Sequence, residues 1–251
     1  MLRTLLTAGK DTNIIGLDVA DVAAGETLEL LRDGEMFLAG LSGSATVTAG
    51  GEKLGQVGGR DSIFDGPASA AYVPPNAPVT LTAGGPATMV IAEAPLADAP
   101  AARARIVAPE DQDVAHRGDG NSARTVRTVL GPNNPAGRLL VGETINPPGN
   151  WSSYPPHKHD THEPPHEAKL EEIYMFKVDP PGGFGVQIRY DERGEECFTV
   201  RDGDVAAIPA GYHPVVAAPG YSLCYLWVMA GEGRQLIPRL DPQHAWVQQG
   251  S

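Results

Sequence analysis

Glycine and proline interrupt this chain of 251 residues at short intervals from end to end. The 30 glycines and 23 prolines are spread along the whole sequence, and short apolar runs lie between them. This pattern is typical of many short strands joined by turns. Hydrophobic residues make up 41% of the chain, enough to form a substantial core. The sequence therefore predicts an all-β protein.

Strands are expected first at residues 35–41 and 45–48, with a hairpin turn at Gly50 and Gly51. Residues 94–122 are rich in Ala, Pro, Asp, Arg and Gly and show little alternation, so we expect a linker there, with room for a short helix. A short apolar strand that ends in proline occurs on both sides of it, which suggests two barrels of related shape. Further strands are expected at residues 71–73, 79–82, 89–91, 125–130, 138–145, 172–178, 185–190, 205–208, 215–217 and 223–229.

The charge of the chain limits its partners. It carries 19 basic and 31 acidic residues, a formal net charge of −12, which disfavours nucleic acids and anionic membranes. No apolar run reaches the roughly 18 residues of a membrane span. The first residues lack the apolar core of a signal peptide, so the expected location is the cytoplasm and the two cysteines predict no disulfide framework.

Histidines cluster in one segment, where His157, His159, His162 and His166 fall within ten residues. On a strand, residues two apart point to the same face, so His157 and His159 can converge on one metal ion. Imidazoles suit a transition metal better than magnesium or calcium. The pair alone is weak evidence, because histidine pairs are common on protein surfaces.

A carboxylate and a fifth histidine extend this pattern. The pair Glu171-Glu172 opens an apolar strand, where an unpaired buried carboxylate would be costly and a metal would remove the cost. His213 follows a turn-rich stretch at residues 203–212. Together these residues predict a site for one divalent metal.

The two segments resemble the two motifs of the cupin superfamily, which supply three histidines and one glutamate to a metal inside a β-barrel. Tyr212 alone separates Gly211 from His213, one residue fewer than is usual in cupins, and the loop before Glu172 is long. A narrower resemblance, to the 5-deoxyglucuronate isomerases of myo-inositol catabolism, covers nearly the whole chain. Trp227 departs from it, since asparagine is expected there. The similar segments are residues 59–65, 72–74, 151–160, 170–174, 183–187, 209–215, 218–221 and 228–231.

This resemblance implies a bicupin, with two jelly-roll barrels and few short helices. Residues 1–110 would form a degenerate barrel without a metal site, and residues 111–251 a barrel with the metal and the active site. The metal ligands would be His157, His159, Glu172 and His213, with the ion Zn, Mn or Fe. The implied reaction is an aldose–ketose isomerisation of 5-deoxy-D-glucuronate to 2-deoxy-5-keto-D-gluconate.

The remaining site residues are open at this point. Candidates for proton transfer are Glu171, Tyr174 and His162, with Glu143 and His166 as further alternatives. The substrate carboxylate requires a cation, for which Arg189 is favoured, with Gln187 two residues earlier on the same strand face. Lys158, between the two histidines, is also a candidate but should point the other way.

Three other functions stay open from the sequence. A 4-deoxy-5-ketouronate isomerase or a metal-dependent dioxygenase would share the metal ligands, and a non-enzymatic cupin would bind a sugar acid without turnover. In each case the expected partner is a small molecule. We also expect a homo-oligomer, a dimer or larger, because cupins often pair through the outside of their barrels.

Overall fold

The computed structural model describes residues 1–96 and 102–250, all in strands, short 3-10 helices, turns and loops. The predicted all-β class is therefore confirmed. Two compact units divide the chain: Met1–Asp113 with Val129–Val141, and Val114–Thr128 with Gly142–Ser251. The domain boundary expected between residues 110 and 111 stays a prediction. The 3-10 helices are η1 (Ile63–Asp65), η2 (Pro109–Asp111), η3 (Gly120–Ser122), η4 (Glu232–Arg234) and η5 (Ala245–Gly250).

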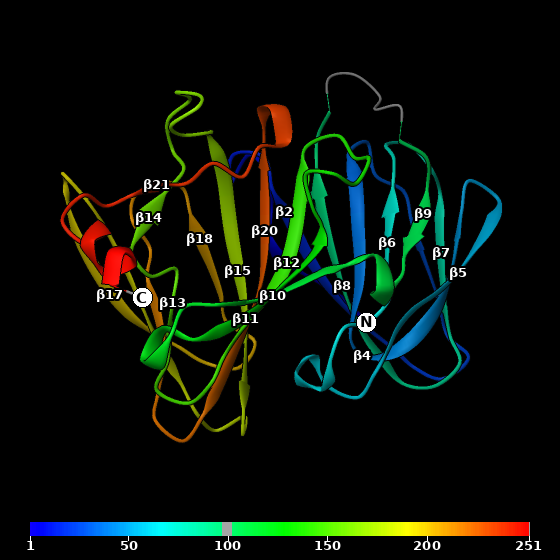
Figure 1. Ribbon diagram of the computed structural model, residues 1–251. Helices are drawn as coiled ribbons and strands as arrows, with labels where there is room; N and C mark the ends of the chain where they lie inside the picture. The colour runs from blue at the N-terminus through cyan, green and yellow to red at the C-terminus, as the bar shows by residue number, and fades with distance from the viewer. Residues whose placement is uncertain (97–101, 251) are drawn as a thin grey trace. The chain divides into compact units, whose positions relative to one another are not determined.

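The first unit is built around one long strand, β4 (Glu35–Ala49), which pairs antiparallel with β5, β6, β7 and β8 (Figure 1). We expected two strands here, but β4 continues through residues 42–44 with register shifts on both of its edges. Such irregularities bend a strand without ending it. The hairpin turn at Gly50 and Gly51 is confirmed, and both have positive φ.

The strands of this unit form a nine-stranded sheet with the main order β1-β2-β8-β4-β6-β9. Strand β3 pairs with β7, and β5 and β7 both pair with β4. The bounds are β1 (Leu2–Leu6), β2 (Gly16–Val22), β3 (Thr27–Leu30), β5 (Glu52–Arg60), β6 (Ala70–Val73), β7 (Val79–Ala83), β8 (Ala87–Ala94) and β9 (Arg105–Val107).

The core of the first unit is apolar. Its buried cluster holds only aliphatic side chains, alanines and methionines; Met36, Leu38, Val47, Leu81 and Met89 are completely buried. Side chains of this kind offer a metal ion no oxygen or nitrogen ligand. The cluster thus fills the unit by packing alone.

One buried carboxylate fastens the segment Val129–Val141 to the rest of this unit. Glu35 is completely buried and accepts a hydrogen bond of 2.8 Å from the Tyr72 hydroxyl. It also accepts the backbone N–H groups of Gly137, Arg138 and Leu139 at 2.7, 2.5 and 2.7 Å. A buried carboxylate is stable only with such partners, and these N–H groups would lack an acceptor without it.

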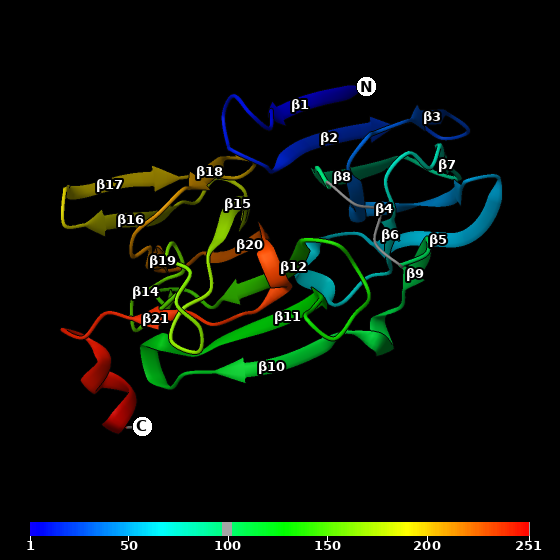
Figure 2. The ribbon, with the colours of Figure 1, turned by 90° about the horizontal axis from the view of Figure 1, so that it is seen from above.

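The second unit contains a six-stranded sheet with the order β10-β11-β12-β20-β15-β18 and a four-stranded sheet with the order β13-β19-β16-β17. Figure 2 shows β10 and β11 running side by side, and the β16–β17 hairpin. The bounds are β10 (Asp113–Arg117), β11 (Arg124–Leu130), β12 (Leu139–Asn146), β13 (Trp151–Ser152), β14 (His157–Lys158), β15 (Leu170–Asp179), β16 (Gly185–Asp191), β17 (Gly194–Val200), β18 (Val205–Ile208), β19 (Val215–Ala217), β20 (Ser222–Gly231) and β21 (Arg239–Leu240).

The stretch expected as a linker, residues 94–122, contains strands that sequence patterning missed. Both β9 and β10 fall within it, and two 3-10 helices occupy the place of the expected short helix. These strands are short and flanked by proline, aspartate and glycine, so neighbouring strands rather than local alternation define them. Residues 97–101, part of the same expected linker, lie outside the described residues. No helix in the described ranges has the length and apolar character needed to cross a membrane.

Replacing Glu35 with Ala should destabilise the protein by about 3 kcal/mol, because it leaves one buried and two part-buried N–H groups without this acceptor. Thermal unfolding followed by circular dichroism would measure the effect. The control is Glu29→Ala on β3, where the side chain is exposed and truncation should change the melting temperature little. Equal melting temperatures for both variants would contradict the role given to Glu35.

Candidate metal and substrate site

Four residues expected to bind a metal come from separate parts of the second unit. His157 opens β14, which pairs with β21, and His159 follows directly after β14. Glu172 is the third residue of β15, and His213 lies in the loop between β18 and β19. Only the tertiary fold brings these segments together.

Three of the four form a tight, buried group. His159, Glu172 and His213 offer ligand atoms that all lie within 4.8 Å of one another. One Glu172 oxygen, Oε2, lies 3.0 Å from His159 Nε2 and 3.2 Å from His213 Nε2. The His157 ring lies beside them, its centroid 4.9 Å from that of His213 and 6.3 Å from that of His159. His157 is adjacent to the group without completing it.

Hydrogen bonds fix the orientation of both imidazoles. His159 Nδ1 donates to the Leu170 carbonyl at 2.9 Å, and His213 Nδ1 donates to the Gly211 carbonyl at 2.9 Å. Because carbonyl oxygens only accept, Nδ1 carries the proton in each ring and Nε2 faces Glu172. His213 Nε2 is buried and has no hydrogen-bond partner among the residues that the structure describes. A carboxylate oxygen facing two such nitrogens requires a cation between them, which a proton or a metal ion supplies.

Burial and neighbouring charges shape the protonation of the group. Burial alone would raise the pKa of Glu172, but the facing imidazoles of His159 and His213 outweigh it and lower the pKa to about 2. Burial, together with the neighbouring His213 and His159, lowers the pKa of His157 to about 3. At neutral pH this leaves an ionised carboxylate and a neutral His157 imidazole, the forms that bind a metal.

A glycine places the loop that carries His213. Gly211 has a φ of 87°, and a side chain there would lie 2.7 Å from the Tyr190 carbonyl oxygen. Tyr212 pairs with Tyr190 through two backbone hydrogen bonds of 2.8 and 2.9 Å. The loop therefore runs directly along β16, and His213 turns inward with a single residue separating it from the glycine.

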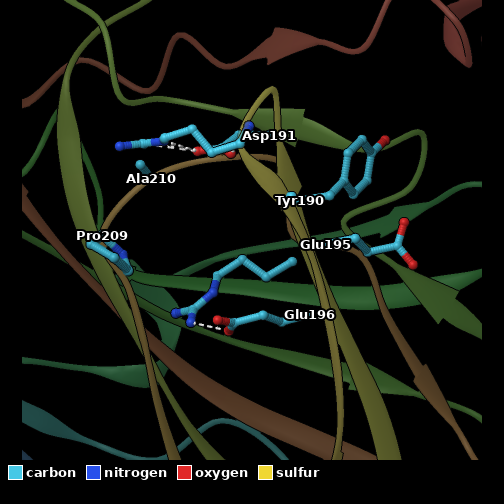
Figure 3. Close-up of a pocket in the computed structure, with 9 residues that line it drawn as sticks. Tyr190, Asp191, Glu195, Glu196, Pro209 and Ala210 are labelled. Carbon is cyan, nitrogen blue, oxygen red and sulfur yellow. Dashed lines mark hydrogen bonds and ion pairs between the residues drawn. The ribbon is translucent and has the colours of Figure 1, made fainter.

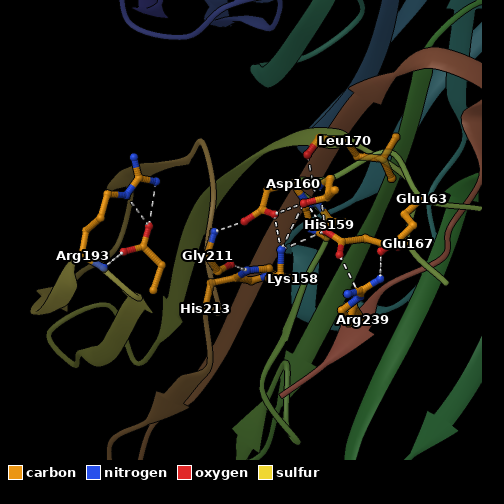
Figure 4. Close-up of polar contacts among 12 residues, drawn as sticks. Lys158, His159, Asp160, Glu163, Glu167, Leu170, Arg193, Gly211, His213 and Arg239 are labelled. Atoms are coloured by element: carbon orange, nitrogen blue, oxygen red, sulfur yellow. Dashed lines mark hydrogen bonds and ion pairs between the residues drawn. The ribbon is translucent and has the colours of Figure 1, made fainter. Parts of the chain in front are cut away.

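A polar network joins this loop to the histidine segment (Figure 4). Asp160 accepts the Gly211 N–H at 2.8 Å and also binds Lys158 Nζ. Glu167, completely buried, accepts the N–H groups of Asp160 and Thr161 at 2.7 and 2.8 Å and lies 3.3 Å from Lys158 Nζ. The network thus ties the segment that carries His159 to the loop that carries His213.

Gln187 supports His213 from β16. Its side chain is completely buried, and Nε2 donates to the carbonyl oxygens of His213 and Pro214 at 2.9 and 3.2 Å. Its expected contact with substrate stays a prediction. In the structure the amide nitrogen is already engaged with the backbone of the loop.

Two adjoining cavities, of about 240 and 370 Å³, open onto the histidine and glutamate residues. His157 and Glu172 line the first, and His157 and His159 line the second. The two share six lining residues: Arg117, Arg124, Val126, His157, Met229 and Leu236. Volumes of this size are typical of sites for small ligands.

Alternate residues of β15 and β20 build one wall of the first cavity. Glu172 and Tyr174 of β15 pair with Met229 and Trp227 of β20, so all four share one face of the sheet. Trp227, which departs from the family pattern, is buried in this wall. A side chain at Gly142 would meet the indole within 2.1 Å, so this glycine makes room for it.

The candidates for proton transfer lie in different environments. Tyr174 lines the first cavity, and its hydroxyl lies 3.0 Å from Ser153 Oγ. Burial, reinforced by Glu172, raises the pKa of Tyr174 well above its usual range, so the hydroxyl keeps its proton. Glu171 faces away from Glu172 on β15, and His162 is exposed in the loop after β14. His166 is exposed in that same loop, and buried Glu143 pairs with Arg127 at 3.1 Å.

The cationic candidates from the sequence lie outside both cavities. Arg189 donates to the Ala207 carbonyl and pairs with Glu196, at a separate surface pocket that includes Pro209 and Ala210 (Figure 3). Lys158 points into the network with Asp160 and Glu167, as its place between two inward residues indicated. Their roles as substrate contacts remain predictions.

Sequence reasoning missed two cavity residues with the right charge, Arg117 and Arg124. Arg124, Val126 and Thr128 alternate along β11, and all three line the first cavity. That alternation was the available signal. It went unused because the strand expected at residues 125–130 began one residue after Arg124. Arg117 was missed because β10, on which it lies, was not recognised as a strand.

Replacing Gln187 with Ala should weaken metal binding roughly 10- to 100-fold, the usual effect of losing a group that positions a ligand. Metal titration of the stripped protein would measure it. Gln56→Ala, in the first unit and exposed on β5, is the matched control and should bind as the unchanged protein does. Unchanged affinity in Gln187→Ala would show that His213 holds its position without it.

Replacing His213 or Glu172 with Ala should reduce the metal content from about one ion per chain to near zero while the protein stays folded, because each supplies one ligand atom. Elemental analysis of the purified variants and circular dichroism would check both parts. The control is His166→Ala, an exposed histidine of the neighbouring loop, which should keep its metal. Full metal content in the His213 or Glu172 variant would rule out the site.

Comparison with known proteins agrees with this fold. Residues 4–247 match the KduI/IolB family. A 5-deoxy-glucuronate isomerase of Geobacillus kaustophilus is 41% identical over 237 residues, 93% of this chain and 85% of that protein. The crystal structure of an IolB-like protein of Salmonella typhimurium LT2 is 32% identical with a TM-score of 0.89, and the match covers 98% of each chain. A mutant of Bacillus subtilis oxalate decarboxylase OxdC matches with a TM-score of 0.66 at 12% identity, over 95% of this chain and 74% of that one.

The likeness to oxalate decarboxylase concerns the fold alone, and it confirms the predicted bicupin architecture. The family match and the identity to curated isomerases extend over most of the chain, so they establish family membership and the class of enzyme. The chain is an isomerase and belongs to the KduI/IolB family.

Proposed function

We propose that this protein is a metal-dependent isomerase that converts 5-deoxy-D-glucuronate to 2-deoxy-5-keto-D-gluconate in myo-inositol catabolism. The observation that carries the proposal is the buried His159, Glu172 and His213 group at the wall of a ligand-sized cavity. The substrate follows from the relatives that are named 5-deoxy-glucuronate isomerases. An aldehyde sugar and its neighbouring hydroxyl need a group that stabilises negative charge on both oxygens.

The residues fit a divalent metal such as Zn, Mn or Fe. His213 Nε2 has no hydrogen-bond partner, and together with His159 Nε2 it faces an ionised carboxylate. The neutral His157 beside them is the proposed fourth ligand. When bound, the metal would act as a Lewis acid for the negative charge that develops on the sugar oxygens as a proton leaves the adjacent carbon.

Tyr174 is the residue of this chain best placed to handle a proton. Its hydroxyl holds a proton at neutral pH, and the contact with Ser153 Oγ fixes its direction. Centroids of the Tyr174 and His213 rings are 6.1 Å apart, so the hydroxyl belongs to the same cavity as the metal group. We assign it the delivery of a hydrogen bond or a proton to a substrate oxygen, a step that general acids accelerate by typically 10²- to 10⁴-fold.

The proposal also covers the organisation of the molecule. The barrel within residues 111–251 would carry the metal and the active site, and the barrel within residues 1–110 would carry neither. The apolar core cluster of the first unit supports the second part. A cytoplasmic homo-oligomer acting on a small sugar acid, without nucleic acid or membrane partners, completes the proposal.

Proton NMR of the metal-loaded protein with 5-deoxyglucuronate in D2O should show conversion to the ketose. Conversion should stop with a chelator and resume when metal is added back, because the metal would stabilise the charge that forms on proton loss. Tyr174→Phe should lower kcat by about 10²-fold or more with its metal content unchanged. Phe176→Leu, a buried change on the same face of β15, controls for altered packing.

No conversion by protein with full metal content would refute the proposed substrate. Oxygen uptake measurements would then test for a dioxygenase, and 4-deoxy-5-ketouronate offered in the same assay would test the sister isomerisation. Conversion that persists after the metal is removed would instead support the proposed substrate and refute the metal dependence.

A further inference from the structure

Two arginines enter the cavity that holds the metal group. Arg117, from β10, and Arg124, the first residue of β11, line both adjoining cavities together with His157. In residues 1–96 and 102–250 neither guanidinium forms an ion pair with a carboxylate. A chain with a net charge of −12 thus leaves two cations unpaired at one cavity.

The environment of Arg124 makes this arrangement costly in the absence of a ligand. Burial lowers the pKa of Arg124, and the neighbouring Arg117 lowers it further, while Tyr225 and Tyr174 act in the opposite direction. Within the described residues, its guanidinium makes one hydrogen bond, from Nη1 to the Ser122 carbonyl at 2.9 Å. A guanidinium carries five N–H donors, so most of them remain available to an anion in the cavity.

We propose that Arg124, assisted by Arg117, binds the carboxylate of the sugar-acid substrate and selects for an acid over a neutral sugar. This assignment rests on the proposed function, because the substrate proposed there carries the carboxylate that the arginines would bind. A guanidinium binds a carboxylate through two parallel hydrogen bonds, which fixes the orientation of the ligand as well as its charge. With the carboxylate held at the arginines, the opposite end of the sugar faces the metal group.

The rest of the shared lining fits this orientation. Besides the arginines and His157, the two cavities share Val126, Met229 and Leu236, all apolar. Such a surface suits a sugar acid whose carbon next to the carboxylate has no hydroxyl. A hydroxyl there would lose its hydration against these side chains without gaining a hydrogen bond.

The cationic residues favoured from the sequence, Arg189 and Lys158, are placed differently. Arg189 is held by the Ala207 carbonyl and by Glu196, and Lys158 by Asp160 and Glu167. Ion pairs of this kind already satisfy the charge of each side chain. Arg124 differs because its charge and its donors have no such partner in the described chain.

The test compares 5-deoxyglucuronate with its neutral C6 carboxamide in the isomerase assay. Arg124→Gln should raise KM for the acid roughly 10- to 100-fold and leave KM for the amide nearly unchanged, because only the acid loses a charged hydrogen-bond partner. Arg124→Lys, which keeps the charge without the paired donors, should recover part of the preference for the acid. Arg193→Gln, an exposed arginine paired with Asp191, is the control and should alter neither substrate.

Metal content and melting temperature of each variant exclude loss of the metal or of the fold as the cause. Suppose the protein without substitutions is active and Arg124→Gln has the same ratio of KM for the acid to KM for the amide. That result would overturn this assignment and leave the proposed function intact. If the unchanged protein converts neither compound, the proposed function fails, and calorimetric binding of 5-deoxyglucuronate and its C6 carboxamide decides the assignment. If the protein binds the acid and Arg124→Gln abolishes this binding, the assignment is supported. If the acid does not bind, or binds equally well to Arg124→Gln, the assignment is refuted.

Discussion

The buried carboxylate of Glu172 is the group on which the site depends. Removing an ionised carboxylate from water costs several kcal/mol unless hydrogen bonds or opposite charge compensate. Here two imidazole nitrogens face one of its oxygens, each turned toward it because the other ring nitrogen donates to a backbone carbonyl. Strand β15 supplies the carboxylate. The segment between β14 and β15 supplies His159, and the loop between β18 and β19 supplies His213. Contacts outside the cavity hold these three segments in their relative positions.

Three residues outside the cavity fix the segments that carry His159 and His213. Asp160 connects the histidine segment to the loop of His213, Gly211 allows that loop to run against β16, and Gln187 binds its carbonyl oxygens from within. The first unit shows the contrast. Its core is a cluster of aliphatic side chains, and its buried carboxylate, Glu35, binds backbone N–H groups and a tyrosine hydroxyl. The two units thus use buried acids for different purposes: one acid fastens a chain segment, and the other joins two histidines in a chemical site.

One cavity of the second unit contains both the groups proposed for the reaction and those proposed to bind the substrate. The histidine and glutamate group lies at one part of its wall, Tyr174 contributes a hydroxyl that keeps its proton, and unpaired guanidinium groups complete the lining. A sugar acid has a carbonyl at one end and a carboxylate at the other, so a site for it needs two distant anchors of different kinds. Trp227 lies in the same wall, where Gly142 makes room for its indole. This departure from the family pattern therefore lies in the cavity wall itself.

The sequence by itself determined the all-β class and the hairpin at Gly50 and Gly51, because these depend on local spacing and strand alternation. The histidines expected around Glu172 came from motif resemblance, and the tertiary fold is what places His159 and His213 beside it. Motif resemblance added the bicupin fold and the isomerase class. Only the tertiary structure decided which cations enter the cavity. Arg189 looked suitable on its strand, but the pairing of β16 with β17 sets it beside Glu196, whereas Arg117 and Arg124 reach the cavity through β10 and β11. Alternation indicates which residues share a face of a strand, but the partner of a long charged side chain depends on strands that are remote in the sequence.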